Sequence, residues 1–182
     1  MSQVNAGSQE SVCYEDLYRV HYPRVLRLCG LLLVDPHEAE DVAQEVFIKL
    51  LQAAQTETRG MAWEPWLTRV AVNACRDRRR SGWWKWWRAP RHTSETEASF
   101  SLDYLSAGPT PEAEALSREV YGHIWRMFRE LPARQQEVFA LRYLEGLSTD
   151  DVAETLGLSV GSVKQHLFRA VHRLRAAIGE ET

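Results

Sequence analysis

Two basic segments of the sequence carry residue types that bind nucleic acid. Residues 69–91 contain eight bases and one acid, a local charge of +7, although the 182-residue chain has a net charge of −3. Residues 160–178 contain four bases and no acid. Because arginine and lysine pair with phosphate groups, two basic segments that begin about 90 residues apart predict two contact sites for a polyanion.

The first basic segment mixes its charges with polar and aromatic side chains. Its members include Asn73, Arg76, Arg78, Arg79 and Arg80, followed by Trp83, Trp84, Lys85, Trp86, Trp87 and Arg88. Cationic groups suit the phosphate backbone, and aromatic faces stack on unpaired bases. The tryptophans leave three interpretations open: contact with nucleic acid, packing in a core or against a protein partner, and contact with a membrane surface.

The second basic segment belongs to a sequence typical of a helix-turn-helix. Ser148 and Ser159 are the predicted N-caps of two helices, and Gly157 permits the left-handed backbone of a tight turn between them. With its apolar stripe inward, the second helix turns outward Lys164, Gln165, Phe168 and Arg169, with His166 and Arg173 nearby. Such a helix fits the DNA major groove. There, basic and amide side chains can hydrogen-bond to the edges of the nucleobases, and a phenylalanine can contact a thymine methyl group. The alternative is a solvated basic face on a packed helix.

Helices are expected to position both segments, because apolar residues recur at steps of three and four. The N-terminal part predicts a helix at 13–33, a second that begins at Asp35-Pro36, and a third from about Trp63 to Ser81. These three are expected to form one bundle. The apolar residues of the first helix, expected on one face, are Leu17, Val20, Tyr22, Val25, Leu28 and Leu32. The polar face of the second helix is expected to carry Glu38, Asp41, Gln44, Glu45 and Lys49.

A stretch rich in proline, serine and glycine at 88–111 predicts a linker. After it, we expect one helix to about Glu130, another from Leu131-Pro132 to about Leu144, and then the helix-turn-helix. The predicted fold is all-α, with two helical domains joined by a flexible linker. Its parts are an N-terminal tail at 1–12, a first domain at 13–87, the linker at 88–111 and a second domain at 112–182.

Composition and motifs argue against several other classes of protein. Apolar residues make up 45% and charged residues 26%, as in ordinary globular proteins, and no apolar run approaches the roughly 18 residues of a membrane span. Three separated cysteines indicate neither a disulfide framework nor a zinc site. We find no nucleophile–base pair, phosphate-binding glycine loop or metal triad, so we expect no enzyme activity, cofactor, metal or small-molecule substrate. The N-terminus lacks an export signal, and the cytoplasm is the expected compartment.

Three stretches resemble bacterial sigma factors of the extracytoplasmic-function (ECF) group. Residues 39–47, AEDVAQEVF, resemble the most recurrent segment of sigma factors. Residues 66–73, WLTRVAVN, with DRRR at 77–80, resemble the group's promoter-melting helix. Residues 131–174, with AETLG and SVK, resemble its C-terminal domain. The motifs occur in the family's order and cover nearly all of residues 13–178.

The resemblance implies a contact for each stretch during transcription initiation. The second helix would meet the basic clamp coiled coil of core RNA polymerase through Asp41, Gln44 and Glu45, and the second domain would meet the flap region. Asn73 would read an extruded base of the −10 promoter element, with phosphates held by Arg76, Arg79 and Arg80. The −35 element would be bound as duplex DNA by Lys164, Gln165, Phe168, Arg169 and Arg173. The resemblance also implies an anti-sigma factor that covers the polymerase-binding faces.

Two features depart from the family pattern. Gln165-His166 stands where the family often has serine or threonine and then arginine, which leaves the preferred −35 sequence open. The tryptophan cluster is also unusual. The alternative function is a stand-alone helix-turn-helix regulator, which predicts salt-sensitive operator binding without polymerase. An acidic helix face next to a basic, aromatic helix in the N-terminal half favours the sigma factor.

Overall fold

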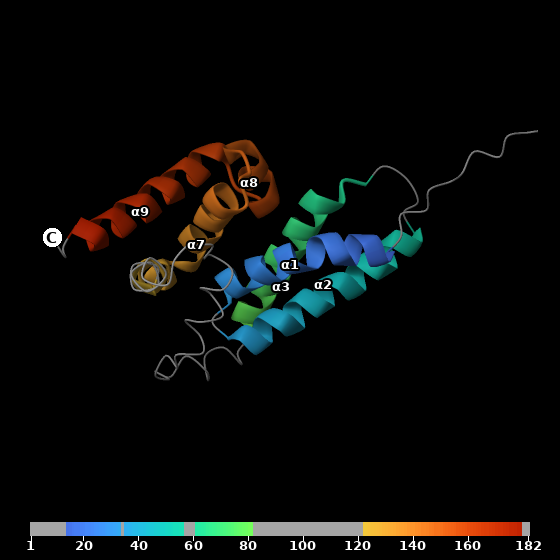
Figure 1. The fold of residues 1–182 in the computed structure, drawn as a ribbon. Helices are drawn as coiled ribbons and strands as arrows, with labels where there is room; N and C mark the ends of the chain where they lie inside the picture. Colours follow the sequence, from blue (N-terminus) through green and yellow to red (C-terminus); the bar gives the residue numbers. More distant parts are fainter. Residues whose placement is uncertain (1–13, 34, 57–60, 82–121, 180–182) are drawn as a thin grey trace, which may run out of the picture.

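The computed structural model describes residues 14–33, 35–56, 61–81 and 122–179 of the chain. Every regular element within these residues is a helix, so the predicted all-α class is confirmed. Figure 1 shows two groups of helices, one built from the N-terminal residues and one from residues 122–179. The predicted tail at 1–12, the tryptophan cluster and the linker at 88–111 lie outside the described residues.

The first helical group consists of α1 (Tyr14–Leu32), α2 (Pro36–Thr56) and α3 (Trp63–Arg80), which all pack against one another. Asp35 begins α2 as predicted, because its Oδ1 accepts the backbone N–H of His37 at 2.8 Å. The side chains of Leu28, Phe47 and Leu67 are completely buried between the helices. This apolar core fixes the acidic face of α2 relative to the basic face of α3.

The predicted apolar face of α1 is wrong at Val20, whose side chain is 68% exposed. The rings of Tyr18 and Tyr22 stack on each other with centroids 4.7 Å apart, and both contact Phe47 of α2. Val20 lies two residues from each tyrosine, which is about 200° around an α-helix. The tyrosines therefore turn Val20 toward solvent.

The predicted polar face of α2 is wrong at Glu38, which is buried. Its side chain is only 9% exposed and forms an ion pair with Arg78 of α3. The sequence pattern placed Glu38 on the polar, solvent-facing side of the helix. A buried carboxylate needs a partner of opposite charge, and this partner is 40 residues away in the sequence.

The second helical group begins with a helix at 122–130 and continues with α7 (Ala133–Phe139), the π-helix η1 (Ala140–Leu144), α8 (Thr149–Leu156) and α9 (Val160–Gly179). The helix predicted from Leu131-Pro132 to about Leu144 is thus confirmed in its extent, but its second half widens from α7 into the π-helix η1. The backbone N–H of Glu145 closes this wider turn by donating to the Ala140 carbonyl oxygen at 3.0 Å. Gly146, at φ +71°, then ends the segment.

The predicted helix-turn-helix is confirmed in α8 and α9. Ser148 and Asp151 form a reciprocal capping box at the start of α8. Gly157 ends α8 in the left-handed conformation at φ +63°, and Ser159 accepts the backbone N–H of Ser162 at 3.1 Å to begin α9. The inward stripe of α9 buries Val163 and packs it into the core.

The two helical groups contact each other through several elements. Helix α3 lies against α8, and α1 lies against α7, which Figure 1 shows as the near edges of the two groups. The basic end of α3 therefore lies close to the second group. None of the helices in the described part of the chain is long and apolar enough to cross a membrane.

Candidate nucleic-acid interface

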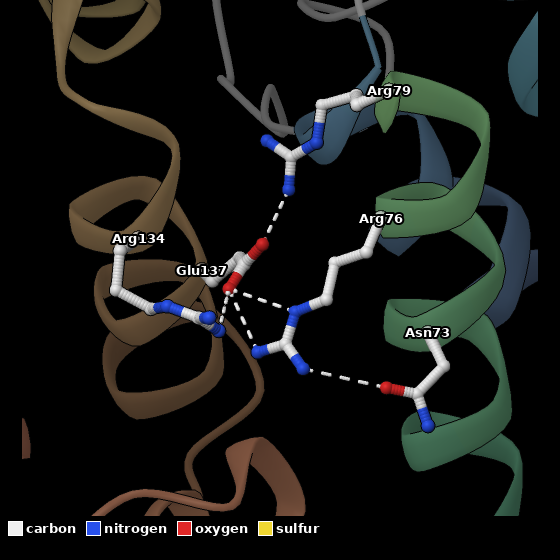
Figure 2. A network of polar contacts seen from close by, with 5 residues as sticks. All are labelled: Asn73, Arg76, Arg79, Arg134 and Glu137. Atoms are coloured by element: carbon white, nitrogen blue, oxygen red, sulfur yellow. Dashed lines mark hydrogen bonds and ion pairs between the residues drawn. The ribbon is translucent and has the colours of Figure 1, made fainter. Parts of the chain in front are cut away.

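The C-terminal half of α3 gathers the basic side chains that the sequence singled out. Its last turn contains Arg78, Arg79 and Arg80, where the helix dipole favours positive charge. Asn73 and Arg80 are exposed, whereas Arg76 is partly buried beside the second helical group. Figure 2 shows that Asn73, Arg76 and Arg79 share the side of α3 that faces α7.

One carboxylate of the second group holds two of these arginines. Arg76 donates from Nε and Nη2 to Oε2 of Glu137 at 3.1 and 2.8 Å, and Arg79 donates from Nη2 to Oε1 at 2.5 Å. Arg134, one turn before Glu137 on α7, donates to Oε2 at 2.8 Å. Figure 2 shows the three guanidinium groups converging on this carboxylate, whose side chain is only 3% exposed.

The cluster around Glu137 keeps an excess of positive charge. Three guanidinium groups carry three positive charges, and the one carboxylate balances one of them. Burial lowers the pKa of Arg79, and the neighbouring charge of Glu137 offsets only part of that effect. Arg76 also donates from Nη1 to Oδ1 of Asn73 at 3.4 Å. Arg76 and Arg79 are residue types that bind phosphate, but in this arrangement their guanidinium groups are paired with Glu137 beside the exposed amide of Asn73.

Arg78 connects the basic end of α3 to the acidic face of α2. Its Nη2 donates to Oε1 of Glu45 at 2.5 Å, and its Nη1 donates to the buried Glu38. Burial acts to lower the pKa of Arg78, but Glu38, Glu45 and Asp41 outweigh it, and the pKa is raised. Glu45 is therefore held in place from α3.

The exposed face of α2 carries more than the three predicted polymerase-binding residues. Asp41, Gln44 and Glu45 are all exposed as predicted. Ile48 is 57% exposed and follows Gln44 by one helical turn, and Leu51 continues the row. Sequence reasoning missed these two apolar residues, although the available signal was the spacing of Ile48, which lies four residues from Gln44 and three from Glu45, and of Leu51, which lies three residues from Ile48. The face thus combines acidic, amide and apolar groups, as protein interfaces do.

The outward side of α9 displays all five predicted duplex-binding residues. Lys164, Gln165, Arg169 and Arg173 are exposed, and the Phe168 ring is 71% exposed. A phenylalanine that points into water contributes nothing to the core, so its apolar surface is available to a partner. These residues lie on a different helix from the α3 cluster, and the structure does not merge the two sets into one site.

Comparison with known proteins gives the family of the chain. Residues 17–85 match the model of sigma-70 region 2, and residues 122–174 match that of sigma-70 region 4. The ECF RNA polymerase sigma-E factor of Haemophilus influenzae (strain ATCC 51907 / DSM 11121 / KW20 / Rd) is 32% identical over 79% of this chain and 77% of its own length. This chain belongs to the ECF sigma factors. The ECF sigma factor SigW of Bacillus subtilis (strain 168) is 28% identical over 96% of this chain and 92% of its own.

The fold of this sigma factor is also found in solved structures. The sigma factor RpoE of Bartonella quintana, solved in complex with the anti-sigma factor NepR, superposes with a TM-score of 0.67 at 17% identity. The match covers 91% of this chain and 96% of that one. The two chains therefore share their fold.

His166 lies apart from the exposed side of α9 in this sigma factor. Its ring is partly buried and faces α7. Burial lowers the pKa of His166, and the charges of Arg134 and Arg169 lower it further, while Glu137 acts in the opposite direction. Its Nδ1 has no hydrogen-bond partner among the described residues. His166 therefore lies close to the Glu137 cluster.

Sequence reasoning missed the carboxylates that receive the arginines of the first group. Glu137 is 61 residues from Arg76, and no local spacing predicts such a pair. Glu145 is a second case: its Oε2 lies 2.6 Å from Nε of Arg24, and its Oε1 lies 3.7 Å from Nη2 of Arg27. Both arginines come from α1. Two carboxylates of the sigma-70 region 4 part thus each contact two arginines of the region 2 part.

The described residues show no cluster of three or more histidine, cysteine, aspartate or glutamate side chains suited to a metal ion. Cys29 and Cys75 are buried free thiols. A hydrogen bond with Cys75 and burial both raise the pKa of Cys29. These two cysteines are consistent with the predicted role of small core residues.

Proposed function

We propose that this sigma factor binds core RNA polymerase, directs it to a set of promoters and assists the melting of promoter DNA. The observation that carries the proposal is the separation of two DNA-type surfaces onto two helical groups. Helix α3 exposes Asn73 and Arg80, and α9 offers a helix of major-groove type. One protein that grips a melted strand and an upstream duplex needs both surfaces.

The polymerase contact is proposed for α2 of the first domain, at 13–87. Asp41, Gln44 and Glu45 meet the basic clamp coiled coil, and Ile48 adds apolar contact at the edge of the polar set. Opposite charge steers the encounter and fixes its register. The second domain, at 112–182, contacts the flap region, and the linker at 88–111 spans the distance between the two contacts.

The −10 element is proposed to bind α3. Asn73 reads an extruded base, because its amide has both a donor and an acceptor. Arg76, Arg79 and Arg80 hold the strand through its phosphates. Extruding a base costs a few kcal/mol, and these contacts offset the cost.

The −35 element is proposed to bind α9 as duplex DNA. Lys164, Arg169 and Arg173 contact guanines or phosphates, Gln165 reads an adenine, and Phe168 contacts a thymine methyl group. The protein acts in the cytoplasm, uses no cofactor and carries out no catalysis of its own. An anti-sigma factor that covers α2 is its proposed inhibitor, by analogy with the complex of RpoE and NepR.

The test is run-off transcription with purified core polymerase on a library of promoter sequences. The wild-type chain should direct initiation at a defined subset of the library. Asp41→Lys should weaken binding to core polymerase by about tenfold or more, because the charge reversal repels the basic coiled coil. Asp16→Lys makes the same charge change on an exposed residue of α1 and should leave polymerase binding intact.

Equal polymerase binding by the wild type and Asp41→Lys would move the interface away from α2. Salt-sensitive binding to a duplex operator by the free chain, with no effect of polymerase, would instead favour a stand-alone helix-turn-helix regulator.

A further inference from the structure

Phe168 and His172 form an aromatic pair on the exposed side of α9. The Phe168 ring is 71% exposed, and it contacts the imidazole of His172 with the ring centroids 6.1 Å apart and the ring planes inclined at 38°. His172 is exposed as well. Tilted ring pairs at such distances attract each other. Since both side chains lie outside the buried core, the pair belongs to the surface that α9 offers to a partner.

Helix geometry places the pair in a row with Lys164. Lys164, Phe168 and His172 follow one another at intervals of four residues, so they lie on the same side of α9. Side chains of an α-helix lean toward its N-terminus, so the imidazole of His172 covers the Phe168 ring from the C-terminal side. Lys164 and His172 are about 12 Å apart along the helix axis. Because a recognition helix contacts base edges with its N-terminal residues, His172 is the member of the row farthest from the bases.

The contact with His172 restricts the conformations of Phe168. A phenylalanine on a helix has two main χ1 rotamers, because the third clashes with the preceding turn. An exposed ring without a neighbour exchanges between them, and holding one rotamer in a complex then costs conformational entropy. The imidazole favours the rotamer in which the two rings touch. Phe168 is thus pre-organised before α9 meets DNA.

A phenyl ring held in one place can distinguish thymine from the other bases of the major groove. Thymine presents its 5-methyl group there, and apolar side chains contact that group. The attraction between apolar atoms falls steeply when a gap opens between them. A ring that moves between rotamers therefore keeps only part of the contact, and a ring held by His172 keeps more of it.

We propose that His172 is a positioning residue for Phe168, and that it makes the contact of Phe168 with a thymine methyl group of the −35 element selective. The inference rests on the proposed function, since it requires α9 to lie in the major groove of that element. His172 acts through the Phe168 ring and does not touch the base. The alternative is a bond from His172 to a backbone phosphate, which would carry no sequence information.

Replacing thymine by uracil in promoter DNA tests the inference. The promoter is a duplex selected from the library by the full chain together with core polymerase. Each thymine of its −35 element is replaced in turn by deoxyuridine, which removes the 5-methyl group and keeps the base pair. The measured quantity is the ratio of two dissociation constants of the complex of chain and polymerase, for the uracil duplex over the thymine duplex.

For the wild type, uracil at one position should weaken binding by about fivefold. Phe168→Ala and His172→Ala should each bring that ratio below about twofold, and the double variant should not lower it further. His172→Gln, which keeps a hydrogen-bond donor without the ring, should behave like His172→Ala. His172→Phe restores a ring and should keep the wild-type ratio. Arg173→Ala is the control, and it should weaken binding of both duplexes to the same degree.

A ratio of one at every position for the wild type would overturn the inference, as would a selected −35 element without an A·T pair. Equal weakening of both duplexes by His172→Ala would also overturn it, because His172 would then act through a phosphate. Failure of the proposed function has a different signature: scrambling the whole −35 element would leave binding unchanged, and the inference would fall with it. Binding that depends on the −35 element but not on any methyl group would refute the inference alone.

Discussion

Arg78 shows how one side chain joins the two functional faces of the first helical group. It lies in the basic last turn of α3, yet its guanidinium contacts Glu38 and Glu45 of α2 rather than solvent. Glu38 is buried, and Glu45 belongs to the proposed polymerase contact. The orientation of α3, the proposed DNA-binding helix, relative to α2, the proposed polymerase-binding helix, thus depends on these ion pairs of Arg78.

Replacing Arg78 by alanine should strongly destabilise the first helical group. Glu38 would remain buried without its partner, which costs about 3 kcal/mol of the free energy of unfolding. Urea unfolding followed by circular dichroism measures the change. Arg80→Ala, at an exposed position in the same turn, should change the stability by less than about 0.5 kcal/mol. Equal effects of the two substitutions would show that the Glu38 pair contributes nothing.

His166 should make the stability of the protein depend on pH. Its pKa in the folded chain lies below the ordinary value of 6.5 because of burial, with Arg134 and Arg169 adding to the effect and Glu137 opposing it. The unfolded chain therefore binds the imidazole proton more tightly than the folded chain does. This contribution to stability is complete above the ordinary pKa and is lost as the pH falls through the folded pKa.

Replacing His166 by glutamine should reduce the loss of stability between about pH 7 and about pH 5. Urea unfolding at several pH values measures the slope. His172→Gln, at an exposed position on the same helix, should keep the wild-type slope. A wild-type slope in the His166 variant would mean that this imidazole is not the group that titrates.

At the scale of elements, local signals predicted most helix boundaries. Local sequence was enough to predict the helix caps, because each cap bond joins residues that are two or three apart. These caps are Asp35, Ser148 and Ser159, and the turn glycine is Gly157. The π-helix η1 was not predicted, because neither a side-chain cap nor a glycine marks its start. The residue that follows it is Glu145, which pairs with Arg24 of α1.

Gly157 offers a test of the turn itself. Gly157→Ala should destabilise the second helical group by about 1 kcal/mol, because an L-residue is strained at φ +63°. An added Cβ would meet nothing within 4 Å, so strain is the only cost. Gly161→Ala, inside α9 with only Ser159 Oγ at 3.9 Å, should instead stabilise it by about 0.5 kcal/mol. The two melting temperatures should therefore shift in opposite directions, and a shared direction would contradict the assigned backbone roles.

At the scale of the whole molecule, the sequence predicted the binding surfaces but not the contact between the two helical groups. The residue types of α3 and α9 indicated nucleic acid, and the family resemblance assigned α2 to polymerase, α3 to the melted strand and α9 to duplex DNA. All five α9 residues are exposed as predicted. The sequence could not predict that Arg76 and Arg79 pair with Glu137, because a carboxylate 61 or 58 residues away produces no periodic pattern. Only the packing of the two groups shows that the proposed strand-binding arginines are already paired.

Permanganate reactivity of promoter thymines tests the proposed division of labour between the two groups. The DNA is a duplex selected from a random library by the chain together with core polymerase. We predict reactive thymines in the −10 region and a protected −35 region only when both proteins are present, with the reactivity reduced by Asn73→Ala and the protection retained. A chain that protects the duplex alone, with no unwinding after polymerase is added, would contradict the function proposed for this protein.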